Sequence, residues 1–98
     1  MAHGSGPSVE AMLDAQNLRD ATMAWTIAEA LGAHENALVV HANGRFHSAD
    51  RLGIPEHLAR LAPDARVLTI TMVEAADIEA APEASADDVV ILTRAASE

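Results

Sequence analysis

A long stretch without glycine or proline constrains the fold of this chain more than any other feature. Neither residue occurs from Val9 to Leu31, where the helix-favouring Ala, Leu, Met, Gln and Glu predominate. Pro7 and Ser8 supply a helix start, and Gly32 supplies a stop. The sequence therefore predicts one long N-terminal helix. Its stripe at spacings of three and four is apolar at both ends and polar in the middle, and consists of Leu13, Asn17, Asp20, Ala24, Ile27 and Leu31.

Composition limits both the core and the choice of partners. The chain has 98 residues, enough for one domain; 50% of them are hydrophobic, yet there is one Trp, one Phe and no Tyr. We therefore expect a thin core. The net charge of −9 would repel a phosphate backbone, so we expect no nucleic-acid partner. No apolar run approaches the roughly 20 residues of a transmembrane helix, and the absence of cysteine excludes thiolate metal sites.

Three short apolar runs after the long helix predict strands. Ala37–His41 is of the kind found in an interior parallel strand, Val67–Val73 alternates as a strand does, and Val89–Thr93 is apolar enough for a third strand. Between the first two runs, Ile54–Leu61 predicts a short helix with Pro55 in its first turn. We therefore predict an α/β fold of open-sheet architecture, in which a partial parallel sheet of about three strands contains a βαβ unit.

The predicted elements define one domain with short ends. We expect residues 1–8 to be a flexible leader or a cloning remnant, residues 9–94 to form the single α/β domain, and residues 95–98 to be a tail. The polar stretch 74–88 is most simply an exposed connection. Because so small a sheet leaves an open edge and an exposed apolar face, the sequence also predicts a homodimer.

The loop from Asn43 to Gly53 is the predicted functional site. It follows the carboxyl end of a predicted parallel strand, where reactive groups gather in open sheets, and it is long for a connection of its kind. Gly44 precedes His47 by three residues, so a tight turn would aim the imidazole back over the strand end. The alternative is a solvated loop histidine. The loop is rich in polar side chains, namely Asn43, Arg45, His47, Ser48, Asp50 and Arg51.

Asp20 interrupts the apolar stripe of the long helix. A buried carboxylate needs a partner, and the adjacent Arg19 diverges from it around the helix, so Asp20 must face another element. Two interpretations stay open: a hydrogen bond that anchors the loop 43–53, or a carboxylate that orients His47 or a bound metal.

Several other conspicuous residues are predicted to have structural roles. Trp25 and Met72 are expected in the core, His41 as a packed or capping residue at a strand end, and His57 on a solvated helix surface. The His41 and His47 spacing matches no standard zinc motif.

Separated segments of the chain match a known pattern in order: Ala15–Ala24, then Val39–Val40 leading into Gly44–Ser48, then Leu52–Leu58. Together they resemble the ChaN-like haem-binding uptake family, within the Tiki/ChaN/EreA-like superfamily that includes the Tiki proteases and erythromycin esterases. The resemblance extends from about Ala11 to Thr93.

The resemblance implies an α/β fold with a helix-flanked parallel sheet, binding of haem or iron, and a dimer formed around the cofactor. It also implies that the chain is the C-terminal part of the usual domain, and a bacterial cell-envelope or periplasmic location. Carried over by position, His47 would be the superfamily's second motif histidine and the contact to haem or metal, Gly44 its glycine, and Arg19 and Asp20 the helix pair facing it.

The remaining pocket residues follow from the same resemblance. Asn43, Arg45 and Asp50 would line the pocket, with Arg45 and Arg51 against haem propionates, and Met23 and Phe46 against the ring. Relatives often have a tyrosine shortly after the histidine; this chain has Asp50 near that point, so ligation would fall to His47 or another histidine.

The haem- or iron-binding function that the resemblance implies involves no catalytic residue. Two alternatives from other functional classes stay open. One is a divalent-metal-dependent hydrolase remnant that uses His47 with Asp20 or Asp50 as base. The other is a non-catalytic fragment that only self-associates.

Overall fold

One long helix, α1, runs from Val9 to Ala33, as the sequence predicts. The computed structural model describes residues 6, 8–82 and 84–94, so most of the predicted leader and all of the predicted tail lie outside the described residues. The Ser8 hydroxyl caps α1 by accepting the Ala11 N–H at 3.1 Å. The predicted stop, Gly32, lies inside the last turn.

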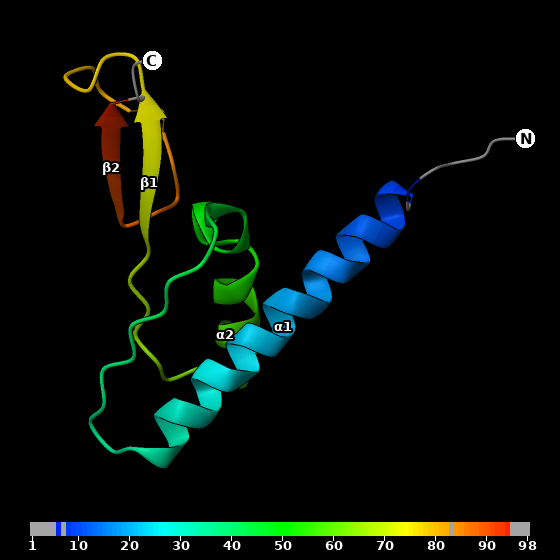
Figure 1. The fold of residues 1–98 in the computed structure, drawn as a ribbon. Coiled ribbons are helices and arrows are strands. Elements are labelled where there is room, and N and C mark those ends of the chain that lie inside the picture. Colours follow the sequence, from blue (N-terminus) through cyan, green and yellow to red (C-terminus); the bar gives the residue numbers. More distant parts are fainter. Residues whose placement is uncertain (1–5, 7, 83, 95–98) are drawn as a thin grey trace, which may run out of the picture.

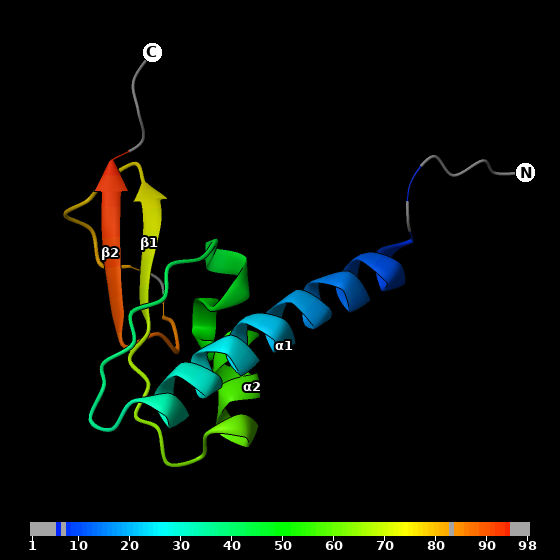
Figure 2. The same cartoon turned by 60° about the horizontal axis from the view of Figure 1, so that its bottom comes forward.

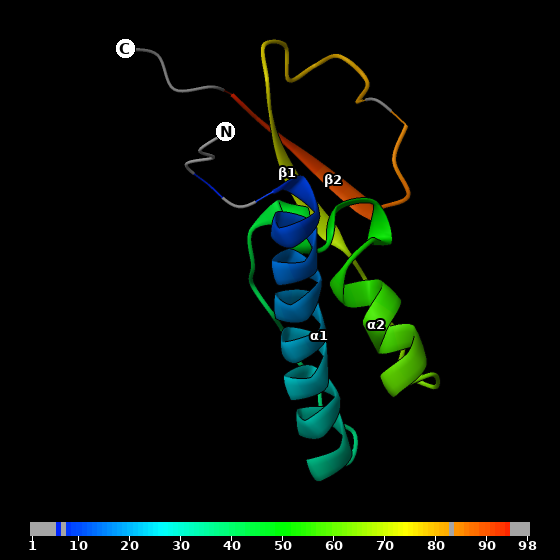
Figure 3. The ribbon, with the colours of Figure 1, turned by 90° about the vertical axis from the view of Figure 1, so that its right-hand side faces the viewer.

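The loop predicted to be functional folds into two short 3-10 turns before the second helix. These are η1 (Arg45–His47) and η2 (Ala49–Arg51), and the helix α2 (Ile54–Leu61) follows with a proline in its first turn, as predicted. Helix α2 packs beside α1 (Figure 3). The first turns of α1 extend away from the rest of the fold (Figure 1).

The sheet has two strands in the described part of the chain, where about three were predicted. They are β1 (Ile70–Ala75) and β2 (Val89–Arg94), which run parallel with Ile70 opposite Val89 and Ala75 opposite Arg94 (Figure 2). Strand β1 begins and ends later than the predicted run. The connection between the strands contains no helix in its described residues, 76–82 and 84–88, which matches the predicted exposed connection.

The prediction that Ala37–His41 forms an interior strand is wrong. This segment runs upward beside the chain that leads into β1 (Figures 1 and 2) but forms no strand. Leu38 is 88% and Val40 85% exposed, whereas Val39 between them packs against the core. The alternation is that of a strand, but a strand also needs a partner for its N–H and C=O groups. The βαβ unit is therefore incomplete.

The core is thin, as the composition predicts, in a molecule that measures 48 × 46 × 24 Å. Its buried apolar residues come from the two helices and are Ala24, Ile27, Ile54 and Leu58. The predictions for Trp25 and Met72 are wrong, because these side chains are 56% and 63% exposed. Leu13, which belongs to the predicted apolar stripe of α1, is also exposed. None of the described helices is both long and apolar enough to cross a membrane.

Candidate functional site

A buried carboxylate on α1 holds the histidine at the end of η1. His47 turns inward, and its Nδ1 lies 2.5 Å from Oδ1 of Asp20, which is 4% exposed. The sequence predicts that Asp20 faces another element and that His47 points toward this face of the helix. The structure contains that arrangement.

The hydrogen bond fixes which ring nitrogen of His47 is available. A carboxylate only accepts hydrogen bonds, so Nδ1 carries the proton and Nε2 keeps its lone pair in the neutral ring. Among the described residues, Nε2 has no hydrogen-bond partner, and the side chain is 24% exposed. A carboxylate that orients an imidazole in this way is the usual arrangement behind a metal-ligating histidine.

A glycine that the sequence analysis did not single out makes the pairing possible. Gly53 precedes α2 with φ +71°, and a Cβ there would lie 2.5 Å from the carbonyl oxygen of His47 and 2.8 Å from Oδ2 of Asp20. Its N–H donates to Glu56 Oε1 at 2.8 Å. Only glycine fits this conformation and this space. In the sequence, the one sign of this need for glycine is the position of Gly53 immediately before a predicted helix.

A second hydrogen bond ties the same loop to α1. Gln16 Nε2 donates to the carbonyl oxygen of Phe46 at 3.0 Å, one turn of helix before the Asp20 contact. The two interpretations of Asp20 therefore coexist, since its hydrogen bond both anchors the loop and orients His47.

Two residues of the predicted pocket act within the loop itself. Asn43 donates from Nδ2 to His41 Nδ1 at 3.1 Å and accepts the Ser48 hydroxyl at 3.0 Å. Gly44 has φ −65°, and a Cβ there would meet His47 Cδ2 at an ordinary 3.7 Å. The predicted tight turn does begin at Gly44, because the His47 N–H donates to the Gly44 carbonyl oxygen at 3.0 Å. It does not need glycine there; the positive φ that needs glycine occurs at Gly53.

The predicted carboxylate Asp50 does not face His47. Its Oδ1 accepts the Ser85 hydroxyl at 2.9 Å and the Ala86 N–H at 3.2 Å, in the connection before β2. A role of Asp50 as base beside His47 has no support in this geometry.

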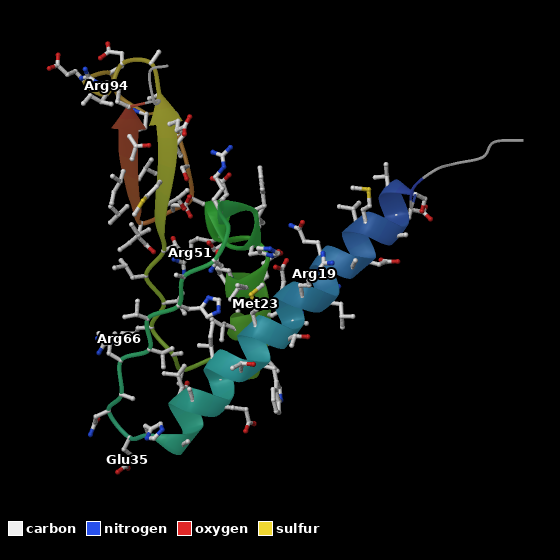
Figure 4. All side chains as sticks on the ribbon, viewed as in Figure 1. Arg19, Met23, Glu35, Arg51, Arg66 and Arg94 are labelled. Carbon is white, nitrogen blue, oxygen red and sulfur yellow. The ribbon has the colours of Figure 1, made fainter. Side chains whose placement is uncertain are left out.

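The basic residues near His47 differ in whether their side chains are already engaged in hydrogen bonds. Arg51 donates to the Val67 carbonyl at 3.2 Å and to Asp88 at 2.6 Å, so it is not available for a propionate (Figure 4). Arg45 is exposed, and its guanidinium lies 5.1 Å from the centre of the Phe46 ring. Arg19 is exposed on α1, one residue before Asp20.

Two further expectations about side chains on the helices are corrected. Met23 packs against the core (Figure 4), so it is not free to contact a ring. His57 is not simply solvated: its Nε2 lies 2.9 Å from Asn17 Oδ1, and Arg60 donates to its Nδ1 at 2.7 Å. Both nitrogens of this imidazole are thus engaged.

A multi-ligand metal site is not formed within the described part of the chain, where no group of three or more His, Cys, Asp or Glu side chains could hold an ion. A zinc hydrolase site needs at least three protein ligands. The lone imidazole of His47 instead matches a cofactor that brings most of its own ligands.

The fold and the site define a small α/β module that presents one carboxylate-oriented histidine. The sequence model of the family described as haem-binding uptake, Tiki superfamily, ChaN matches residues 1–58, which include α1, the loop with His47 and most of α2. The chain therefore belongs to this family. The expected continuation of the likeness to Thr93 lies outside that match. Comparison with curated proteins and with solved structures gives no match.

Proposed function

We propose that the chain binds haem, with Nε2 of His47 as the protein ligand to the iron. The observation that carries the proposal is the hydrogen bond from His47 Nδ1 to Asp20, which leaves Nε2 as the free nitrogen of a ring held in place. The family description, haem-binding uptake, supports the same cofactor.

The donor set fits haem better than a bare divalent ion. The porphyrin supplies four nitrogens, so one axial imidazole is enough to attach the iron to the protein. Among the described residues, the imidazole that a carboxylate holds in place is that of His47, and no cluster of ligands accompanies it. With no tyrosine in the chain, histidine is the natural axial ligand, and bound haem would supply redox-active iron.

Residues around His47 support the proposal in different ways. Asp20 is a positioning residue, which fixes the orientation and the tautomer of the His47 ring through Nδ1. The exposed Arg45 and Arg19 are suited to pair with the two propionates. Gly44 leaves room beside the ring, and Asn43 holds the loop through His41 and Ser48. Arg51 and Asp50 are omitted because their side chains are engaged elsewhere.

A titration with ferric haem, followed by the Soret band, tests the ligand. The full chain should saturate at one haem per chain, and His47→Ala should lose the ligated spectrum. Asp20→Asn should bind about 10–100-fold more weakly, because the outer partner of a ligating histidine has effects of that size. His34→Ala is the matched control, because His34 is exposed at the end of α1, and it should behave as the unmodified chain.

Rescue separates ligation from a merely structural role of His47. Added imidazole should restore the ligated Soret spectrum of haem with His47→Ala, because free imidazole can take the vacated axial position. An identical weak response from the full chain, His47→Ala and His34→Ala would contradict the proposal.

We also propose that the chain forms a homodimer through the segment Ala37–His41. Leu38 and Val40 are highly exposed, and among the described residues Leu38 to His41 make no backbone–backbone hydrogen bond. An unpaired edge of this kind can pair with the same edge of a second copy about a two-fold axis. Val40→Lys should shift sedimentation toward the monomer, whereas Ala33→Lys should not. A chain that sediments as a monomer without either change would rule the dimer out.

A further inference from the structure

The turn η2, which follows His47 in the chain, contains two consecutive residues in the left-handed region of backbone conformation. Asp50 has φ +58° and Arg51 has φ +62°. Contact between Cβ and the backbone makes this region unfavourable for residues other than glycine; aspartate tolerates it best, whereas an arginine there is strained. Such conformations persist only where the surrounding structure holds them in place. Contacts from outside the turn must therefore hold η2.

Those contacts come from the end of the connection that leads into β2. Asp50 Oδ1 accepts the Ser85 hydroxyl at 2.9 Å and the Ala86 N–H at 3.2 Å. The guanidinium of Arg51 donates to Asp88 at 2.6 Å. Each of the two strained residues is thus tied by its side chain to residues that are more than 30 positions away in the sequence.

The backbone of Asp50 contributes to the same contact. Burial acts to raise the pKa of Asp87, but hydrogen bonds from the Asp50 backbone and from the hydroxyls of neighbouring side chains lower it below its usual value. The Asp87 carboxylate is therefore ionised at neutral pH and favours a backbone N–H beside it. Both the side chain and the backbone of Asp50 are held by the segment before β2.

Ser48 connects this strained turn to the candidate haem ligand. Its N–H donates to the Arg45 carbonyl oxygen and closes η1, and its own carbonyl oxygen accepts the Arg51 N–H and begins η2, both at 3.1 Å. The chain then turns back so closely that Gly53 has no room for a Cβ beside the His47 carbonyl oxygen. A change of φ within η2 would redirect the chain between His47 and Gly53 and shift the imidazole relative to α1.

We propose that the segment Ser85–Asp88, which we call the latch, positions the haem ligand: it holds η2 in its strained conformation and thereby keeps His47 against Asp20. The inference rests on the proposed function, because it concerns the same imidazole. It goes further by making haem affinity depend on a segment outside residues 1–58, which the family model matches. Displacement of the latch lets η2 relax and reduces the fraction of chains in which His47 is in place.

Substitutions of Asp50 separate its side-chain contacts from the strain of its backbone, without haem. Asp50→Asn keeps an acceptor oxygen and tolerates a positive φ, so it should behave as the full chain. Asp50→Ala loses the contacts and keeps the strain, so the Ala86 amide proton should exchange about tenfold faster with solvent, and the backbone chemical shifts of Arg51 should move to those of a negative φ. Asp50→Gly permits the positive φ, so only the Ala86 exchange should rise.

A Soret titration with ferric haem gives the functional readout. Asp50→Ala should bind haem about tenfold more weakly than the full chain, with the same ligated spectrum at saturation, because the ligand is retained and only its placement is lost. Ser85→Ala leaves the Ala86 N–H as a donor and should lose less. Asp50→Asn should bind as the full chain does. Asp64→Ala is the matched control, because it removes the same charge from the exposed turn after α2, and it should also bind as the full chain does.

The two measurements fail separately. Unchanged Ala86 exchange and Arg51 shifts in Asp50→Ala would overturn the latch, even in a chain that binds no haem. Equal haem affinities of the full chain and Asp50→Ala would overturn its effect on the ligand. A full chain that binds no haem contradicts the proposed function, whereas the expected order of the Asp50 variants in exchange and shifts would still support the latch.

Discussion

Two regions of the molecule differ in how far their polar groups are paired and their apolar side chains buried within the chain. Where α1, the loop and α2 meet, Asp20 is paired with His47, Gln16 with the loop backbone, and apolar side chains are buried. Around the strands, Leu38 and Val40 are exposed, and one face of the sheet presents further apolar side chains to solvent, namely Ile70, Met72, Val89 and Ile91.

The difference shows where the stability of this chain originates. The corner between the helices is closed by contacts within the chain, whereas the strand region leaves apolar surface and part of its backbone without partners in the described residues. We therefore expect substitutions at the corner to unfold the protein and equivalent substitutions near the strands to have small effects on stability. The following predictions test that contrast.

The largest effect is expected from Gly53→Ala. The added Cβ would lie 2.5 Å from the His47 carbonyl oxygen, at a residue with φ +71°. Strain of the backbone alone costs about 1–3 kcal/mol, and separation of His47 from Asp20 adds to it, so we expect a loss of about 4 kcal/mol in the free energy of unfolding. Denaturant unfolding measures it.

Gly44→Ala is the matched control for this change. Its φ of −65° suits alanine, and the added Cβ would make only an ordinary contact at 3.7 Å. We expect a change within about 0.5 kcal/mol. Similar losses for the two glycine variants would show that the Asp20–His47 corner does not depend on Gly53.

A pair of leucines compares the two regions directly. Leu58 is 5% exposed in the core between the helices, whereas Leu38 is 88% exposed on the unpaired segment. Leu58→Ala should lower the free energy of unfolding by about 2–4 kcal/mol, and Leu38→Ala by less than about 0.5 kcal/mol. The measurement belongs at protein concentrations where the chain is monomeric. An equal loss for Leu38→Ala would mean that the unpaired segment is buried in solution.

Sequence reasoning succeeded where local signals decide the structure. The start of α1 at Ser8 and the proline in the first turn of α2 act within a few residues, so the sequence locates both helices. Ala37–His41 carries the local signal of a strand, but a strand also depends on a partner far away in the chain. No sequence window contains that information, and the prediction failed there.

The same distinction applies to the site. A carboxylate on an apolar stripe must find a partner, and this requirement was enough to predict that Asp20 faces inward from α1. The need for glycine at position 53 arises from three chain segments that meet in space, which the sequence does not reveal. The direction of Asp50 was missed for a similar reason, because its partners Ser85 and Ala86 come from the connection before β2.

The smallest effect is expected at the boundary between the two regions, where Asp88 joins the loop to the start of the sheet. The backbone N–H of Thr69 first, and then its hydroxyl and the Arg51 guanidinium, stabilise the carboxylate and lower the pKa of Asp88. The folded chain thus binds this proton less readily than the unfolded chain. The stabilisation is present above the unfolded pKa of about 4 and is lost as the pH falls through the lower folded pKa.

Thermal unfolding between about pH 6 and pH 2 tests this linkage. The full chain should lose stability with acid more steeply than Asp88→Asn, whose amide does not titrate, whereas Asp64→Asn should retain the slope of the full chain. Because Arg51 also belongs to the loop that carries His47, protonation of Asp88 should loosen the contact between this loop and the start of the sheet. Parallel pH slopes for the full chain and Asp88→Asn would show that the two regions are not coupled through this carboxylate.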